Sequence, residues 1–410
     1  MGDAEKGRFN IELAETQMTA LLAVKKHFEK KKPFKGLRIG MALHVTKETA
    51  VLVRTLEAGG AEVWLTGCNP LSTQDDVAAA LKDRGTHVFG YKGQTNEEYY
   101  ECIKEVISCK PHITIDDGCD LVSEIHKNHS ELIPDIIGGC EETTTGVLRL
   151  KAMEKDGALL YPVIAVNDNL TKHLMDNYYG TGQSTLDGVM RACNFMFSGK
   201  TVVVAGYGSC GKGVALRASG MGAKVIVCEV DPFRALQAHM DGFSVMKMDD
   251  ACKLGNLFIT VTGNINVIRP EHVRKMKNGA ILANSGHFDC EIDIPGIKKQ
   301  AKTSRRVRPF MDEYVVAADK KVFVLSEGRL VNLAAAEGHP SDVMSLSFCG
   351  QALACEYLVD NKGKLPPGVS FLPEEIDYYI SRMHLESEGI EIDKLTPEQE
   401  KYLASWEEGT

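Results

Sequence analysis

Short apolar runs alternate with amphipathic stretches along most of this chain, a pattern typical of parallel α/β folds. In the first half, residues 48–58 and 73–84 carry apolar positions at helical spacing. The apolar runs around them predict a doubly wound sheet. Its strands are expected at 37–45, 62–66, 87–91, 113–115 and 163–166.

A second series of the same kind begins at Thr201 and predicts a second sheet. A chain of 410 residues exceeds a single typical core, so the fold class expected is α/β with two doubly wound parallel-sheet domains. Residues 185–197 predict a helix that joins the domains, and the glycines within 180–182 offer a hinge. The further strands of the second series are expected at 224–228, 257–262, 280–284 and 321–325.

The pattern changes beyond Glu327. Residues 338–341 include glycine and proline and interrupt the chain, and 343–359 predict a long apolar helix without a strand partner. We expect this helix to return to the first domain, which would create a second crossing and a cleft. The domains are therefore expected at 1–180 with a return segment at 338–372, at 181–337, and in a charged helical arm at 373–410.

A glycine motif in the middle of the chain carries the clearest chemistry. The apolar residues 202–205 run into G-x-G-x-x-G, and a helix-compatible stretch at 213–222 follows. The next strand ends on Glu229, whose carboxylate can accept both ribose hydroxyls of NAD and would repel the extra phosphate of NADP. This combination predicts a Rossmann-type NAD site, with a ligand-free glycine-rich loop as the alternative. The loop residues expected at the cofactor are Gly206, Gly208, Ser209, Cys210 and Gly211.

Composition excludes two classes of function. Hydrophobic residues make up 44% and charged residues 25% of the chain, and the net charge of −9 argues against a nucleic-acid partner. No apolar run approaches the roughly 20 residues that span a bilayer, and the first residues lack the apolar core of a secretion signal. Twelve cysteines are scattered without a C-x-x-C pair. We therefore expect reduced thiols, no metal site and a cytoplasmic location.

Polar residues follow the predicted strands of the first domain, at the edge where open α/β sheets bind ligands. Any one of them could be a helix cap or a solvated turn. Their repetition at successive strands favours a binding site. These residues are His44, Thr46 and Glu48, then Asp116 and Asp117, then Glu141, Glu142, Thr143, Thr144 and Thr145, and finally Asn167 and Asp168.

Lys172 and Asp176 lie one helical turn apart beyond the last of these strands. They could form a simple surface ion pair. Lys172 beside an oxidisable hydroxyl could instead be a general base, provided that burial lowers its pKa. His287 follows the strand at 280–284, and His339 lies at the expected domain crossing. A buried structural histidine is the alternative for both.

Longer motifs resemble those of the S-adenosylhomocysteine hydrolase family. They occur in the family's order and span almost the whole chain, and several are unlike those of other dehydrogenases. The motifs are LHVTKET at 43–49, CNPLSTQD at 68–75, DDG at 116–118, EETTTG at 141–146, ND at 167–168, AGYG at 205–208, GHFD at 286–289, EGRLVNL at 327–333 and GHP at 338–340.

The resemblance implies a tightly bound NAD that is regenerated in each turnover. Enzymes of this family oxidise the 3′-hydroxyl of the substrate ribose to a ketone, which acidifies the hydrogen on the 4′ carbon. Loss of that hydrogen expels homocysteine from the 5′ carbon, water adds, and the ketone is reduced again. The implied reaction is the reversible hydrolysis of S-adenosyl-L-homocysteine to adenosine and L-homocysteine.

The resemblance also implies residue roles. Lys172, oriented by Asp176, would serve the 3′-hydroxyl, Glu142 would hold the ribose hydroxyls, and Asp117 would be the base at the 4′ carbon. The leaving sulfur and the incoming water would be served by His44 and His287. The base and the homocysteine tail would contact Thr46, Glu48, Thr49, His339, Met344 and Phe348. NAD would be held by the glycine loop and by Thr143, Thr144, Thr145, Asn177, Glu229, Arg234, Thr262, Ser285, Gly286, His287, Asn332 and His339.

The sequence departs from longer family members in its tail. Those members continue into a Lys- and Tyr-bearing segment that reaches NAD in a neighbouring protomer, whereas Glu-Glu-Gly-Thr ends this sequence. That contact is not expected here in its usual form, but a homodimer or homotetramer is. Thr181 stands where many members have cysteine. The lack of long insertions indicates the short type seen in archaea and thermophiles.

Three other functions stay open at this point. An NAD-dependent 2-hydroxy-acid dehydrogenase shares the two-domain topology, and a redox-sensing NAD-binding module would also explain the glycine motif. A third alternative is hydrolysis of S-inosyl-L-homocysteine by the same mechanism. A carboxylate at Glu48 accepts from the amino group of adenine and repels the carbonyl of hypoxanthine, so it favours the adenosyl substrate.

Overall fold

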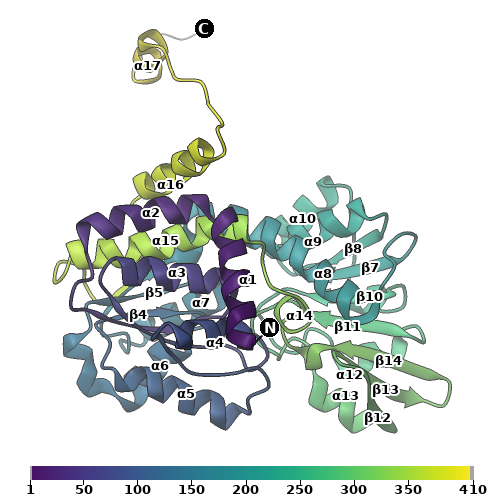
Figure 1. Cartoon of the computed structure of the whole chain (residues 1–410). Coiled ribbons are helices and arrows are strands. Elements are labelled where there is room, and N and C mark those ends of the chain that lie inside the picture. Colours follow the sequence, from purple (N-terminus) through teal and green to yellow (C-terminus); the bar gives the residue numbers. More distant parts are fainter. Residues whose placement is uncertain (1, 407–410) are drawn as a thin grey trace.

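The computed structural model describes residues 2–406, which form two β-sheets in two lobes that lie side by side (Figure 1). Met1 and residues 407–410 lie outside the described residues, and so does the chain end on which the expectation about the tail rests. The expected fold class, α/β with two doubly wound domains and a helical C-terminal region, is confirmed.

The first sheet has seven parallel strands in the order β15-β6-β5-β4-β1-β2-β3. Its central strands are buried, as a parallel sheet covered by helices requires. Its strands are β1 (Arg38–Ala42), β2 (Glu62–Thr66), β3 (His87–Val88), β4 (Ile113–Asp116), β5 (Gly138–Glu141), β6 (Pro162–Ala165) and β15 (Gly368–Ser370). Its helices are α1 (Asp3–Gln17), α2 (Thr19–Lys31), α3 (Lys47–Ala58), α4 (Asp75–Asp83), α5 (Asn96–Ser108), α6 (Asp120–Asn128), η1 (Ser130–Asp135), α7 (Thr144–Lys155) and α15 (Ser341–Asp360).

The second sheet has eight strands in the order β12-β13-β14-β11-β10-β7-β8-β9. It is mixed rather than wholly parallel, because short turns join β12 to β13 and β13 to β14, and such turns permit only antiparallel pairing. Its strands are β7 (Thr201–Ala205), β8 (Lys224–Cys228), β9 (Ser244–Val245), β10 (Leu257–Thr260), β11 (Ala280–Asn284), β12 (Thr303–Arg308), β13 (Met311–Ala317) and β14 (Lys320–Leu325). Its helices are α9 (Ser209–Gly220), α10 (Pro232–Met240), α11 (Met248–Ala251), α12 (Pro270–Lys275), α13 (Ile294–Gln300), η4 (Ser326–Gly328) and α14 (Val331–Ala334).

The long apolar helix returns to the first sheet, as expected. α15 packs against α2, α3 and β5. The expectation that no strand follows it is wrong, because Gly368–Ser370 forms β15 and pairs in parallel with β6. Three residues with one glycine give too weak a period-2 pattern to be recognised in the sequence.

The chain crosses between the sheets at two neighbouring places. At the first, the π-helix η3 (Thr171–Gly180) continues directly into α8 (Thr181–Cys193), so residues 180–182 are helical rather than an irregular linker. At the second, Gly338 adopts a φ of +85°, and His339 follows it. A Cβ on Gly180 would lie 2.9 Å from the His339 ring, which shows how closely the two crossings pack.

The C-terminal arm begins with α16 (Glu374–Ser387), which packs on α15 and α2. The arm then extends to α17 (Pro397–Leu403), which lies away from both lobes (Figure 1). Within residues 2–406, no helix combines the length and the apolarity that crossing a membrane demands.

The close packing of α9 on η3 generates a stability prediction. A Cβ on Gly213 would lie 1.9 Å from the backbone oxygen of Tyr178, whereas Gly220, at the end of the same helix, has nothing within 4 Å of its Cβ position. Gly213→Ala should therefore destabilise the protein by about 1–3 kcal/mol, because backbone must move apart. Gly220→Ala is the matched control and should stabilise by up to about 1 kcal/mol. Urea unfolding of both variants measures the difference, and a Gly213→Ala protein as stable as wild type would contradict the packing.

Candidate active site

One cavity of about 720 Å³ lies between the two sheets, at the carboxyl ends of their parallel strands. Every residue that the sequence placed at the substrate or the cofactor lines this cavity, except Gly211. Gly211 instead allows α9 to pack on the strand before it, since its Cβ would lie 2.0 Å from the backbone oxygen of Gly206. The geometry thus brings together groups that are far apart in the sequence.

The glycine loop has the form that a dinucleotide requires. Gly206 has a φ of +104°, which favours glycine, and a Cβ on Gly208 would meet nothing nearer than Arg234 at 3.6 Å. The loop therefore leaves open space beside the N-terminus of α9, where a pyrophosphate is stabilised. Glu229 lines the same cavity at the end of β8, and its carboxylate accepts the Tyr207 N–H at 2.7 Å. These features fit NAD.

His173 is a cavity residue that the sequence reasoning missed. Its Nε2 lies 3.0 Å from the hydroxyl of Ser209 in the glycine loop, and its Nδ1 lies 3.4 Å from Asn177. His173 therefore connects η3 to the phosphate-binding turn. The motifs gave no indication of it, because this residue stands between Lys172 and Asp176 on a helix whose pitch departs from the α-helical one.

A buried cluster of charges lies at the centre of the cavity. The Nζ of Lys172 lies 2.8 Å from Asp176 and 3.4 Å from Glu142, and it donates to Asn177 at 2.7 Å. All four side chains are buried. His339 contacts Asp176 through a very short hydrogen bond, so the second chain crossing is tied to the same cluster.

The cluster reverses the expected direction of one pKa. Burial alone would lower the pKa of Lys172, but the carboxylates of Asp176 and Glu142 outweigh burial and raise it above its ordinary value. Burial would raise the pKa of Asp176, but Lys172 and His339 lower it. The proviso that burial makes Lys172 a free base is therefore wrong for this arrangement. Lys172 is an ammonium paired with carboxylates.

Glu142 receives its other partners from α15. The hydroxyl of Ser347 donates to one carboxylate oxygen at 2.5 Å, and the amide of Gln351 donates to the other. Burial is the largest cause of a raised Glu142 pKa, which Lys172 opposes. Ser347 and Gln351 are four residues apart on a largely apolar helix, where they could only be read as core positions in the sequence.

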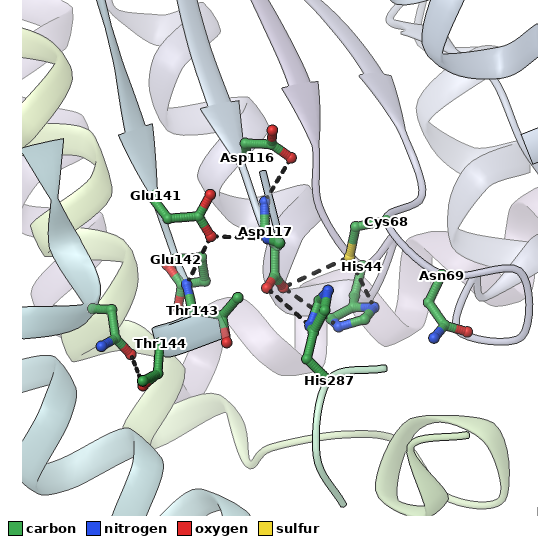
Figure 2. A network of polar contacts seen from close by, with 12 residues as sticks. His44, Cys68, Asn69, Asp116, Asp117, Glu141, Glu142, Thr143, Thr144 and His287 are labelled. Atoms are coloured by element: carbon green, nitrogen blue, oxygen red, sulfur yellow. Dashed lines mark hydrogen bonds and ion pairs between the residues drawn. The ribbon is translucent and has the colours of Figure 1, made fainter. Parts of the chain in front are cut away.

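A second cluster surrounds Asp117 (Figure 2). One carboxylate oxygen of Asp117 lies 3.4 Å from Nε2 of His44, and the other lies 3.5 Å from Nδ1 of His287. The thiol of Cys68 lies 3.6 Å from the same oxygen as His44 does. Ser72 fixes the other nitrogen of His44 at 2.7 Å. Cys68 and Ser72 belong to the 68–75 motif, but the sequence assigned neither a role.

Two buried carboxylates support this cluster from below. Asp116 accepts the N–H of Asp117 at 2.9 Å, and Glu141 accepts the N–H groups of Gly118 and Thr143 at 2.8 and 3.0 Å. Burial raises the pKa of Asp116 to about 7 and raises the pKa of Glu141 further from its ordinary value. Both residues position the loops and do not line the cavity.

The far end of the cavity is shaped by α3 and α15. Glu48 accepts from the hydroxyl of Ser341 at 2.6 Å and lies 3.4 Å from the Nζ of Lys47. Thr46 caps α3 by accepting the Thr49 N–H. Apolar walls come from Leu43, Met344 and Phe348.

Comparison with known proteins decides the family. Residues 177–338 match the model described as "S-adenosyl-L-homocysteine hydrolase, NAD binding domain", and residues 1–134 match the model described as "S-adenosyl-L-homocysteine hydrolase". The chain belongs to the S-adenosyl-L-homocysteine hydrolase family. It is therefore an enzyme of a hydrolase family that acts on a small molecule and uses NAD, and the 2-hydroxy-acid dehydrogenase alternative falls away.

Relatives of the S-adenosyl-L-homocysteine hydrolase family match over almost the whole chain. The adenosylhomocysteinase of Sulfurisphaera tokodaii is 58% identical over 99% of this chain and 98% of its own length. The S-inosyl-L-homocysteine hydrolase of Methanocaldococcus jannaschii is 57% identical over the same shares. One of the dipicolinate synthase subunits of Bacillus halodurans superposes with a TM-score of 0.50 at 14% identity, over 80% of this chain and 99% of that one, which shows the fold alone.

Residues of the hydrolase family motifs on the NAD side are also in contact with one another. Glu291, which the sequence reasoning missed, accepts from the backbone and hydroxyl of Thr262 at 2.7–3.1 Å. The hydroxyl of Ser285 lies 2.6 Å from Thr185, and Asn332 donates to Ser184 at 3.2 Å. The remaining predicted positions that line the NAD half are Thr143, Thr144, Thr145, Asn177, Cys210, Arg234 and Gly286.

The burial of His44 generates a pH prediction. Burial lowers the pKa of His44 from 6.5 to about 4 in the folded protein. Between these values the unfolded chain binds a proton that the folded protein does not, so the contribution of His44 to stability rises with pH and levels off above about 6.5. The total rise is at most about 3 kcal/mol.

Urea unfolding of wild type and His44→Asn checks this prediction. The stability difference should shift in favour of wild type as the pH is raised from about 4.5 to about 7. Parallel pH profiles for the two proteins would show that this imidazole titrates normally in the folded state.

Proposed function

We propose that this enzyme hydrolyses S-adenosyl-L-homocysteine reversibly to adenosine and L-homocysteine. The observation that carries the choice of base is the buried carboxylate of Glu48 at the far end of the cavity. Its partner Ser341 donates to it, so the carboxylate acts as an acceptor there. An adenine amino group would satisfy it, whereas a hypoxanthine carbonyl would leave two acceptors opposed.

S-inosyl-L-homocysteine is the second candidate substrate. It is supported by the Methanocaldococcus jannaschii relative of that name, whose identity to this chain is almost the same as that of the adenosylhomocysteinases. Lys47 offers a further reason, since its ammonium lies 3.4 Å from Glu48 and could donate to a carbonyl. We favour the adenosyl substrate because Lys47 is already held by Glu337 at 2.9 Å.

The roles that we propose at the ribose follow from the charge cluster. NAD, when bound, supplies a reversible oxidation of the 3′ carbon. Glu142 would accept from the ribose hydroxyls, which would replace Lys172 as its partners. Lys172 would then be the group that takes the proton of the 3′-hydroxyl and later returns it, with Asp176 holding its position. The ammonium form observed for the cluster suits the returning step directly.

The proposed roles at the 4′ and 5′ carbons belong to the cluster around Asp117. A ketone at the 3′ carbon acidifies the 4′ hydrogen, and Asp117 would accept that proton as the bond to sulfur breaks. His44 and His287 lie on either side of Asp117 and could give a proton to the departing thiolate and take one from the incoming water. Water adds at the 5′ carbon while a proton returns to the 4′ carbon, so the cycle balances.

We further propose the assembly and location expected from the sequence. A homodimer or homotetramer is supported by the apolar side chains that the arm exposes, among them Tyr402, Leu403 and Trp406. Reduced cysteines, all free among the described residues, support a cytoplasmic location. The domain boundaries at 180/181 and 337/338 are supported by the two crossings.

The base preference is testable directly. Purified protein supplied with NAD should release homocysteine from the adenosyl thioether with a kcat/KM roughly 5- to 150-fold above that for the inosyl thioether, the range expected for one unpaired buried polar group. Glu48→Gln offers a donor as well as an acceptor and should narrow the ratio. A ratio in favour of the inosyl thioether would reverse the assignment in favour of the second candidate.

The role of Asp117 is tested by isotope exchange. Asp117→Asn should slow homocysteine release by at least about 10²-fold, the usual contribution of a general base. It should also abolish the exchange of the 4′ hydrogen of adenosine with solvent deuterium. The exposed Asp135 provides the matched control, because Asp135→Asn removes a carboxylate far from the cavity. Unimpaired exchange in Asp117→Asn would assign the base to another residue.

A further inference from the structure

Three metal-ligating side chains meet at the ends of three neighbouring strands. His44 follows β1, Cys68 follows β2 and Asp117 follows β4, and these strands are adjacent in the sheet. One ligand atom from each lies within 4.8 Å of the other two. Figure 2 shows the imidazole, the thiol and the carboxylate pointing toward one another.

We propose that His44, Cys68 and Asp117 form a binding site for a thiophilic divalent cation of the zinc class, and that this cation inhibits the enzyme. Ligand atoms around a tetrahedral zinc ion lie about 3.3–3.6 Å apart, given the usual bond lengths to nitrogen, oxygen and sulfur. Here Sγ of Cys68 lies 3.6 Å from Oδ2 of Asp117, and Nε2 of His44 lies 3.4 Å from the same oxygen. The site needs little rearrangement to accept the ion.

The surroundings of the three ligands suit a metal. Ser72 holds Nδ1 of His44 at 2.7 Å, which orients the ring and leaves Nε2 as the ligand. Cys68 and Asp117 are buried, with 5% and 7% of their surface exposed, so water competes weakly for the ion. Binding forms bonds from the metal to nitrogen, oxygen and sulfur, and the thiol proton of Cys68 leaves to solvent. The mixture of soft sulfur with nitrogen and oxygen favours zinc, cadmium or cobalt over magnesium.

The open fourth position gives the site its consequence. Three protein ligands leave a tetrahedral ion one position, as in catalytic zinc sites. That position faces the cavity, where His287 lies 3.5 Å from Asp117. This step rests on the proposed function: the thiolate of homocysteine would leave beside these residues and could complete the coordination. The metal would then hold two residues of the reaction and its product together.

Cobalt provides the probe for the site. The NAD-bound enzyme without thioether should bind one Co²⁺ per chain and develop a thiolate charge-transfer band and the intense visible bands of four-coordinate cobalt. Cys68→Ser should remove the charge-transfer band and weaken binding by at least about tenfold. Cys102→Ser is the control, since that thiol is more exposed, lies outside the cavity and should leave the spectrum unchanged. Asp117→Asn keeps the thiol and should weaken binding while the band persists.

A missing charge-transfer band, or one that survives in Cys68→Ser or disappears in Cys102→Ser, would overturn the site. Inhibition is measured separately: Zn²⁺ should suppress homocysteine release, a chelator should restore it, and added homocysteine should tighten Zn²⁺ binding. Zn²⁺ that binds without suppressing release would refute the inhibitory role. If neither thioether is hydrolysed, the proposed function fails while the cobalt titration still decides the metal site.

Discussion

The positive charge of Lys172 is almost completely withdrawn from water, and the site is arranged around the carboxylates that neutralise it. Breaking a buried ion pair on one side costs about 3–5 kcal/mol, so the three charges must be brought together in the folded chain. Glu142 comes from the end of β5 and Asp176 from the π-helix. The polar residues of α15 then complete Glu142, which explains why the chain returns to the first sheet.

The sequence predicted much of this arrangement because strand ends and glycine turns have local signatures. The turn at Gly206 needs a positive φ, and the acidic residue at the end of β8 stands where ribose chemistry wants it. The strands of both sheets were recognised by their apolar runs, although their ends were placed up to three residues too far. The helix through Thr181 begins earlier and ends earlier than its pattern indicated.

What the sequence could not give depends on long-range contacts. Ser347 and Gln351 have ordinary helical spacing, and only the packing of α15 turns them toward Glu142. The pKa of Lys172 depends on carboxylates from two other positions, so burial taken alone gave the wrong direction. β12 has no apolar pattern because its side chains are exposed, and only its pairing with β13 defines it.

The contact between Gly180 and His339 has a mechanical consequence. Two attachments that lie far apart would fix an axis and allow only rotation about it. Two attachments that nearly touch act as a single pivot, so each lobe is a long lever about a short fulcrum. A displacement of a fraction of an ångström at the pivot then becomes a displacement several times larger at the mouth of the cavity. Because His339 also contacts Asp176, the position of the levers and the charge state of the centre both act on the same side chain.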